Sequence, residues 1–74
     1  MFDVRKNSDE VIRIAEMTYK SQQYVDIRVW VVGDSDNELI PTKRGVRFRK
    51  VHAQEIIDAI ESIRQGKGSA RKRA

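Results

Sequence analysis

The sequence predicts an α+β domain in which a four-stranded antiparallel sheet is followed by one C-terminal helix. Residues 24–32 alternate between apolar and polar side chains with a period of two, as a strand with one buried face does. Shorter alternating stretches lie on either side and are separated from it by turn-forming residues. After residue 51 the spacing of apolar residues changes to that of a helix.

Each strand is predicted from its own alternation. Residues 2–5 alternate apolar with charged side chains and predict a short first strand. Residues 10–19 are rich in β-branched side chains, and the turn-like residues 20–22 follow them, which favours a strand and hairpin over a helix. The strand that starts at Leu39 contains Pro41, which cannot donate to a ladder and so predicts a sheet edge or a bulge. Short connections make the order an antiparallel meander.

The C-terminal segment divides into a helix and a tail. We expect the apolar stripe of the helix to pack on the sheet, and Gly66 to cap the helix. The domain should span residues 1–65, with 66–74 as a disordered basic tail. The residues predicted for the dimer contact or core of the helix follow one stripe at helical spacing: Ile56, Ile57, Ile60 and Ile63.

Length and composition limit the class of protein. A chain of 74 residues is one small domain, and without cysteine it has neither disulfides nor thiolate metal sites to stabilise it. We therefore expect a homodimer, since pairing adds buried area. The sequence shows no secretory signal pattern and no apolar run that could cross a bilayer. The expected location is cytoplasmic and nucleoid-associated, with no membrane partner.

Catalysis, cofactors and metals are not expected. The single histidine, His52, has no cysteine or second histidine with which to form an acid-base or nucleophile pair. The acidic loop at Asp34 and Asp36 resembles the opening of a calcium loop, but Leu39 and Gly45 stand where that loop needs glycine and glutamate. No catalytic, metal-binding or cofactor residue is therefore predicted.

The polar side of the central strand is the candidate functional face. Single-stranded nucleic acid binds to surfaces that combine cations for the phosphates with aromatic rings for the bases. The net charge of +4 adds to this, because basic residues concentrate in 43–50 and in 64–74. The predicted nucleic-acid-binding residues are the aromatic and basic side chains on or near this face: Tyr19, Lys20, Tyr24, Arg28, Trp30, Lys43, Arg44, Arg47 and Arg49.

Other interpretations stay open for several of these side chains. Tyr24 and Trp30 would also suit cross-strand pairs or a dimer contact, and Arg28 could simply pair with a carboxylate. Arg47 and Arg49 share one strand face, where like charges repel unless an anion lies between them, which favours a phosphate contact. The same face would also suit RNA, or a protein partner.

Two motifs carry a resemblance to a known family. Tyr19-Lys20 is followed by YVDIR at residues 24–28, and PTKRGV at residues 41–46 precedes the helix. Together they resemble the single-stranded-DNA-binding domain of the transcriptional coactivator called positive cofactor four, in its small prokaryotic or viral form, over residues 2–65. The resemblance implies a curved sheet, a homodimer formed through helices and strands, and binding of single strands or unwound duplex with little sequence preference.

The resemblance also implies roles for individual residues. Tyr19 matches an aromatic residue that stacks on a base, and Lys20 follows it as a cation for the phosphate backbone. Arg28 matches the arginine of the Asp-Ile-Arg triplet, and Lys43 and Arg44 match the basic pair before the glycine. The implied function is a non-catalytic protein that assists transcription, replication or repair, with transcription or replication proteins as further partners.

Overall fold

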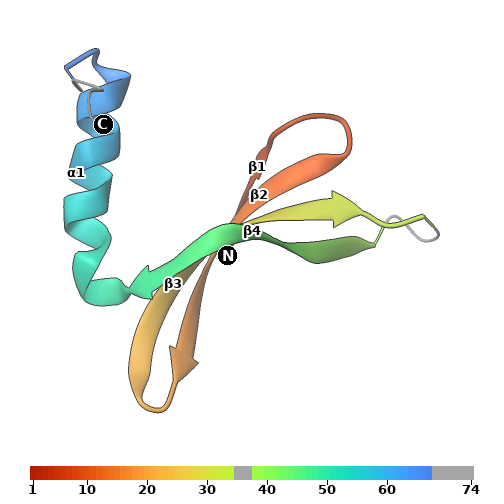
Figure 1. Ribbon diagram of the computed structural model, residues 1–74, viewed down its shortest axis with the longest axis horizontal. Helices are drawn as coiled ribbons and strands as arrows, with labels where there is room; N and C mark the ends of the chain where they lie inside the picture. The colour runs from red at the N-terminus through yellow and green to blue at the C-terminus, as the bar shows by residue number, and fades with distance from the viewer. Residues whose placement is uncertain (35–37, 68–74) are drawn as a thin grey trace.

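The computed structural model describes residues 1–34 and 38–67. Four strands form one antiparallel sheet in sequence order (Figure 1): β1 (Phe2–Arg5), β2 (Glu10–Tyr19), β3 (Gln22–Val32) and β4 (Leu39–Arg49). A short 3-10 helix leads from the sheet into one α-helix: η1 (Lys50–His52) and α1 (Ala53–Arg64). The predicted α+β class, the meander and the C-terminal helix are confirmed. The central strand begins two residues earlier than its alternation indicates.

A two-residue turn joins β2 to β3. Lys20 and Ser21 have φ angles of 51° and 66°, and a type I′ turn requires positive φ at both of its central residues. The twist of this turn matches the twist of the strands, so the hairpin keeps an unbroken register from Tyr19–Gln22 to Glu10–Val31. The hairpin predicted here is confirmed.

The edge strand β4 carries a bulge, as Pro41 predicts. Gly45 pairs with Arg28 and Pro41 pairs with Trp30, so β4 has two more residues than β3 between these pairs. Because the excess is two, the alternation of side chains is in the same phase on both sides of the bulge. Pro41 and Gly45 therefore lie on the same side of the sheet.

The C-terminus of α1 is closed by a glycine cap. Gly66 has a φ of 81°, the left-handed conformation that favours glycine. Its N–H donates to the carbonyl of Ile63 at 2.9 Å, and the N–H of Lys67 donates to the carbonyl of Ser62 at 2.8 Å, which is the Schellman arrangement. The predicted cap is confirmed. Of the tail predicted to be disordered over 66–74, Gly66 and Lys67 belong to this cap, and residues 68–74 lie outside the described residues.

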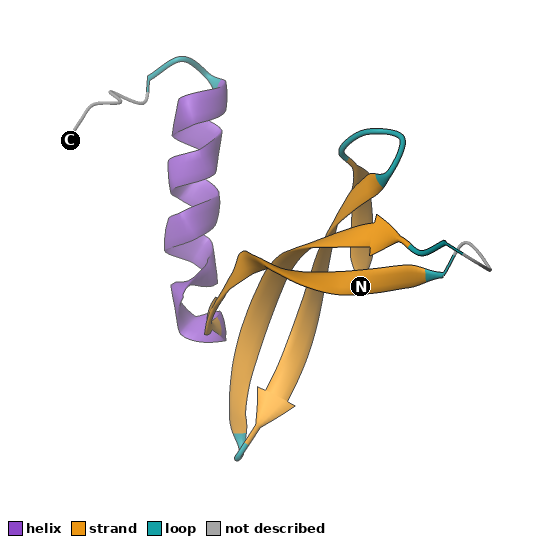
Figure 2. Ribbon diagram, turned by 45° about the vertical axis from the view of Figure 1, so that its right-hand side comes forward, coloured by secondary structure: helices purple, strands orange, loops and turns teal. Residues whose placement is uncertain are grey.

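The helix does not pack on the sheet, which corrects the expectation from its apolar stripe. It stands beside the sheet and points away from it in both overall views (Figures 1 and 2). Ile57, Ile60 and Ile63 keep exposed fractions of 55%, 55% and 67%. The physical reason is the connection, because β4 runs through the three-residue η1 straight into α1, with no loop that would return the helix over the sheet.

Little apolar surface is buried within one chain. Among the described residues, Val11 at 8% exposure is the one buried apolar residue, and Asp26 at 7% is the one buried charged residue. Val46 on β4 keeps an exposed fraction of 55%. Neither α1 nor η1, the helices of the described part, has the length and apolarity that a membrane crossing requires. The sheet thus leaves one apolar side without cover.

Candidate nucleic-acid interface

The two faces of the sheet differ in chemistry. Directly paired residues of neighbouring strands point to the same side, so the register assigns every side chain to a face. The aliphatic face carries branched and aromatic apolar residues of β2, β3 and β4: Ile12, Ile14, Val25, Ile27, Val29, Val46 and Phe48. The polar face carries charged, aromatic and sulfur-containing residues: Asp3, Arg13, Met17, Tyr19, Tyr24, Asp26, Arg28, Trp30, Arg47 and Arg49.

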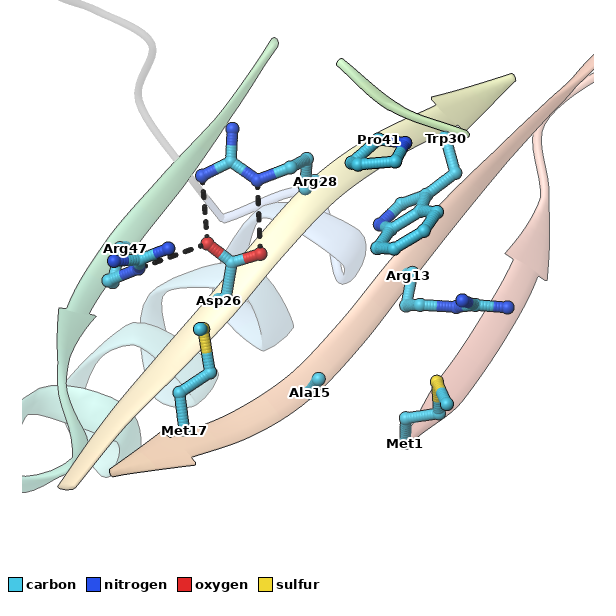
Figure 3. A pocket seen from close by; sticks show the side chains of 9 residues that line it. All are labelled: Met1, Arg13, Ala15, Met17, Asp26, Arg28, Trp30, Pro41 and Arg47. Atoms are coloured by element: carbon cyan, nitrogen blue, oxygen red, sulfur yellow. Dashed lines mark hydrogen bonds and ion pairs between the residues drawn. The ribbon is translucent and has the colours of Figure 1, made fainter. Parts of the chain in front are cut away.

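Asp26 lies in the middle of the polar face between two arginines (Figure 3). Arg28, two residues further along β3, binds its carboxylate twice: Nε donates to Oδ2 at 3.1 Å and Nη2 donates to Oδ1 at 2.9 Å. Arg47 reaches the same carboxylate from β4, where its Nε donates to Oδ1 at 3.4 Å. The sequence predicts an anion beside Arg47 and Arg49. At Arg47 the carboxylate of Asp26 already supplies this anion.

The two arginines of this cluster are held to different degrees. Arg28 also donates from Nη1 to the carbonyl of Thr42 at 3.0 Å, and its side chain is 20% exposed, against 49% for Arg47. The hydrogen bond from Arg28 is the largest cause that lowers the pKa of the Asp26 carboxyl, with Arg47 contributing less. Asp26 in turn raises the pKa of Arg28. Arg28 is thus fixed, while Arg47 is loosely attached.

A second cluster surrounds Trp30. The guanidinium carbon of Arg13 lies 4.5 Å from the centroid of the indole ring, within the range of a cation–π contact. Asp3 on β1 holds Arg13 in place with two contacts of 2.8 and 2.9 Å, which lower the pKa of the Asp3 carboxyl. Sequence reasoning missed Arg13, although the two-residue turn fixes its position opposite Arg28.

The polar face is hollowed between these two clusters. The hollow has a volume of about 370 Å³ and is open to solvent (Figure 3). Apolar atoms form most of its surface, while guanidinium groups stand around it. Its lining comes from β2, β3, β4 and the first residue: Met1, Arg13, Ala15, Met17, Asp26, Arg28, Trp30, Pro41 and Arg47. An apolar floor with cations at its rim suits a planar ring attached to a phosphate.

The remaining aromatic residues extend the polar face toward the tip of the β2–β3 hairpin. Tyr19 is 62% exposed, and the ammonium of Lys20 lies 5.4 Å from the centroid of its ring. Tyr24 is half-buried and is paired with Met17 on one side and Arg49 on the other. Tyr19, Tyr24, Trp30 and Arg49 are therefore grouped on one face, as the alternation predicts.

The basic pair in the bulge of β4, Lys43 and Arg44, is not part of this group as a whole. The guanidinium of Arg44 pairs with the carboxylate of Glu10, which shares the aliphatic side with its partner Val31. Lys6 donates to the same carboxylate at 2.9 Å, and the hydrogen bonds from Lys6 and then Arg44 are the main causes that lower the pKa of Glu10 to about 2. Lys43 is exposed and forms no ion pair with any described residue.

A twisted antiparallel sheet with interleaved cations and aromatic rings on its polar face has the features of a nucleic-acid-binding domain. The chain belongs to the family described as Transcriptional Coactivator p15 (PC4), whose model matches residues 6–59. The resemblance seen in the sequence is confirmed, and membership indicates a DNA-binding, coactivator-like role.

Solved structures agree with this assignment. A PC4 homologue from Burkholderia pseudomallei, in its orthorhombic crystal form, is 30% identical, with a TM-score of 0.80 over 86% of this chain and 85% of that chain. A bacteriophage T5 homologue of PC4, described as implicated in recombination-dependent DNA replication, shares the fold at 22% identity, with a TM-score of 0.71 over 88% of this chain and 75% of that chain. No curated protein shows significant sequence similarity to the chain.

Proposed function

We propose that the polar face binds single-stranded DNA, or the unwound strands of a duplex, without catalysis and with little sequence preference. The observation that supports this most is the placement of the Asp26 cluster beside the Arg13–Trp30 pair on the polar face (Figure 3). Exposed guanidinium and ammonium groups attract the phosphates, and rings give the bases a surface for stacking. The protein would serve transcription, replication or repair, in the cytoplasm and at the nucleoid.

Different residues would meet the two parts of a nucleotide. The cations that keep exposed charge on or next to the polar face would contact phosphates: Lys20, Lys43, Arg47 and Arg49. The rings of Tyr19, Tyr24 and Trp30 would contact bases. Stacking on a ring is worth about 1–3 kcal/mol per base and tolerates any base, which fits binding with little sequence preference.

The expected result with DNA is a preference for single strands that weakens with salt. Four phosphate contacts predict a slope of about −3 for the logarithm of the affinity against the logarithm of salt, or about fiftyfold weaker binding between 50 and 200 mM. Titration with oligo(dT) and with a duplex of equal length measures both, and the fluorescence of the single tryptophan, Trp30, should be quenched by the oligonucleotide. Equal or tighter binding of the duplex would contradict the proposal. Competition with an RNA strand of matching length shows whether the face prefers DNA.

We also propose a homodimer, with the apolar surfaces that one chain leaves uncovered as its interface. The helix stripe and the aliphatic face are exposed in the single chain, with Val46 and Ile60 each at 55%. Exposed apolar area of this kind usually marks an association surface. Pairing through it would leave the polar face of each chain free for DNA.

A lysine in the helix stripe should dissociate this dimer. Ile60→Lys places a charge at the centre of the stripe, and an expected loss of about 2 kcal/mol corresponds to a dissociation constant about thirtyfold higher. Ser62→Lys adds the same side chain to the same helix away from the stripe and should leave the dimer intact. Sedimentation equilibrium of wild type and both variants makes the comparison. A monomeric wild type, or an Ile60→Lys dimer of unchanged affinity, would argue against this interface.

A further inference from the structure

We infer that Asp26 is an internal counter-ion which holds Arg28 permanently and Arg47 only until DNA binds, so that a phosphate takes Arg47, and not Arg28, from the carboxylate. This inference rests on the proposed function and specifies its chemistry. It gives Asp26 the role of a positioning residue that limits the affinity of the face. It gives Arg28 the role of fixing Asp26 rather than touching DNA.

The two arginines are attached to Asp26 unequally. Arg28 is engaged through Nε, Nη1 and Nη2, at 3.1, 3.0 and 2.9 Å, by Asp26 and the carbonyl of Thr42. Arg47 has one contact, at 3.4 Å, and half of its side chain is exposed. A competing anion therefore displaces little when it takes Arg47, whereas taking Arg28 would leave a buried carboxylate and a backbone carbonyl without their donors.

Asp26 is held in a fixed position on β3. Its residue is 7% exposed and its carboxylate is anchored by Arg28 on the same strand, so it does not move away when Arg47 does. Carboxylate and phosphate oxygens accept guanidinium hydrogen bonds in the same way, which makes them competitors for Arg47. A phosphate bound to Arg47 would also lie close to the negative charge that remains at Asp26. Asp26 thus opposes binding both by holding Arg47 and by repelling the phosphate.

Removing the charge at Asp26 should therefore tighten binding. Asp26→Asn keeps the size of the side chain, and loss of one like charge several ångströms from a phosphate predicts oligo(dT) affinity about three- to tenfold higher at low salt. The salt slope should stay close to the wild-type value, because Arg47 already neutralises a phosphate in the wild-type complex. Glu16→Gln removes the same charge from the aliphatic side, where Glu16 pairs with Lys50, and should change affinity less than about twofold because that charge is distant and screened.

A double-mutant cycle shows whether the gain passes through Arg47. In an Arg47→Ala background, Asp26→Asn should give at most about half of the fold-gain that it gives in wild type, because the residue it releases is absent. A gain of equal size in both backgrounds would overturn the role of Arg47. Unchanged or weaker binding by folded Asp26→Asn would overturn the role of Asp26.

A measurement on the unmodified protein keeps the inference testable if Asp26→Asn does not fold. Titration of wild type with oligo(dT), followed by the NMR resonances of the arginine Nε–H groups, should move the Arg47 signal and leave the Arg28 signal in place. Movement of Arg28 with a static Arg47 would overturn the inference while leaving DNA binding intact. Absence of any oligo(dT) binding by wild type would instead remove the proposed function, and this inference with it.

Discussion

Replacing Arg28 by alanine should lower the free energy of unfolding clearly more than replacing Arg47 by alanine, since it leaves the carboxylate of Asp26 and the carbonyl of Thr42 without their donors. The remaining partner is Asp26, whose residue is 7% exposed and which loses the donors at 2.9 and 3.1 Å. A domain of this size has only about 5–15 kcal/mol of stability, so a difference between the two variants is readily measured. Urea unfolding followed by far-UV circular dichroism measures it, with protein concentration held constant because the stability of an oligomer depends on it.

Arg47→Ala is the matched control for this prediction. Arg47 touches the same carboxylate through one contact at 3.4 Å with a half-exposed side chain, so its removal should cost less than about 1 kcal/mol. The deficit of Arg28→Ala should also shrink at low pH. Arg28 lowers the pKa of Asp26, so the stabilisation by the ion pair is present above the ordinary carboxyl range and is lost as the pH falls. Equal losses in both variants, at every pH, would contradict this account of the cluster.

Gly45→Ala should cost about 3 kcal/mol, at the upper end of the range for overpacked sites. A Cβ at Gly45 would lie 2.6 Å from the carbonyl oxygen of Ile27 and 2.9 Å from the Cα of Arg28. Both are backbone atoms of β3, which cannot rotate away as a side chain would. The two strands must therefore separate at the pair that supports the Asp26 cluster.

Gly66→Ala is the comparison for the glycine prediction. Gly66 has open space around its Cα and differs from Gly45 in needing a positive φ, so its replacement should cost about 1 kcal/mol. Thermal or urea unfolding of the two variants ranks them. A smaller loss for Gly45→Ala than for Gly66→Ala would show that β3 and β4 are not packed as closely as described.

The alternation of the strands was enough to predict the sheet and the division of its faces. Period two in residues 24–32 places Arg28 and Trp30 on one side, and the same rule places Arg47 there too, which the structure confirms through their common position beside Asp26 and the hollow. The turn at Lys20–Ser21 and the cap at Gly66 were readable because each depends on a local conformation. Rules that depend on neighbouring residues alone therefore predicted the strands, the turn and the cap.

Contacts between segments that are distant in the sequence could not be predicted in the same way. The stripe of α1 predicts an apolar contact but not which chain supplies it, and α1 does not lie on its own sheet. The partner of Arg44 is Glu10, on another strand and toward the aliphatic side. Arg13 meets Trp30 only once the register is fixed. The role of Gly45 is likewise set by β3, across the sheet.

The most direct test compares two arginines of the same strand. Arg44 and Arg47 have similarly exposed side chains, at 56% and 49%, but lie on opposite sides of the sheet. Affinity of Arg44→Ala and Arg47→Ala for oligo(dT), measured at two salt concentrations, separates the faces. If the polar face binds DNA, Arg47→Ala weakens binding about five- to tenfold and lowers the salt slope by about 0.7, while Arg44→Ala changes affinity less than about twofold. A loss for Arg44→Ala that equals or exceeds the loss for Arg47→Ala would contradict the assignment of DNA binding to the polar face.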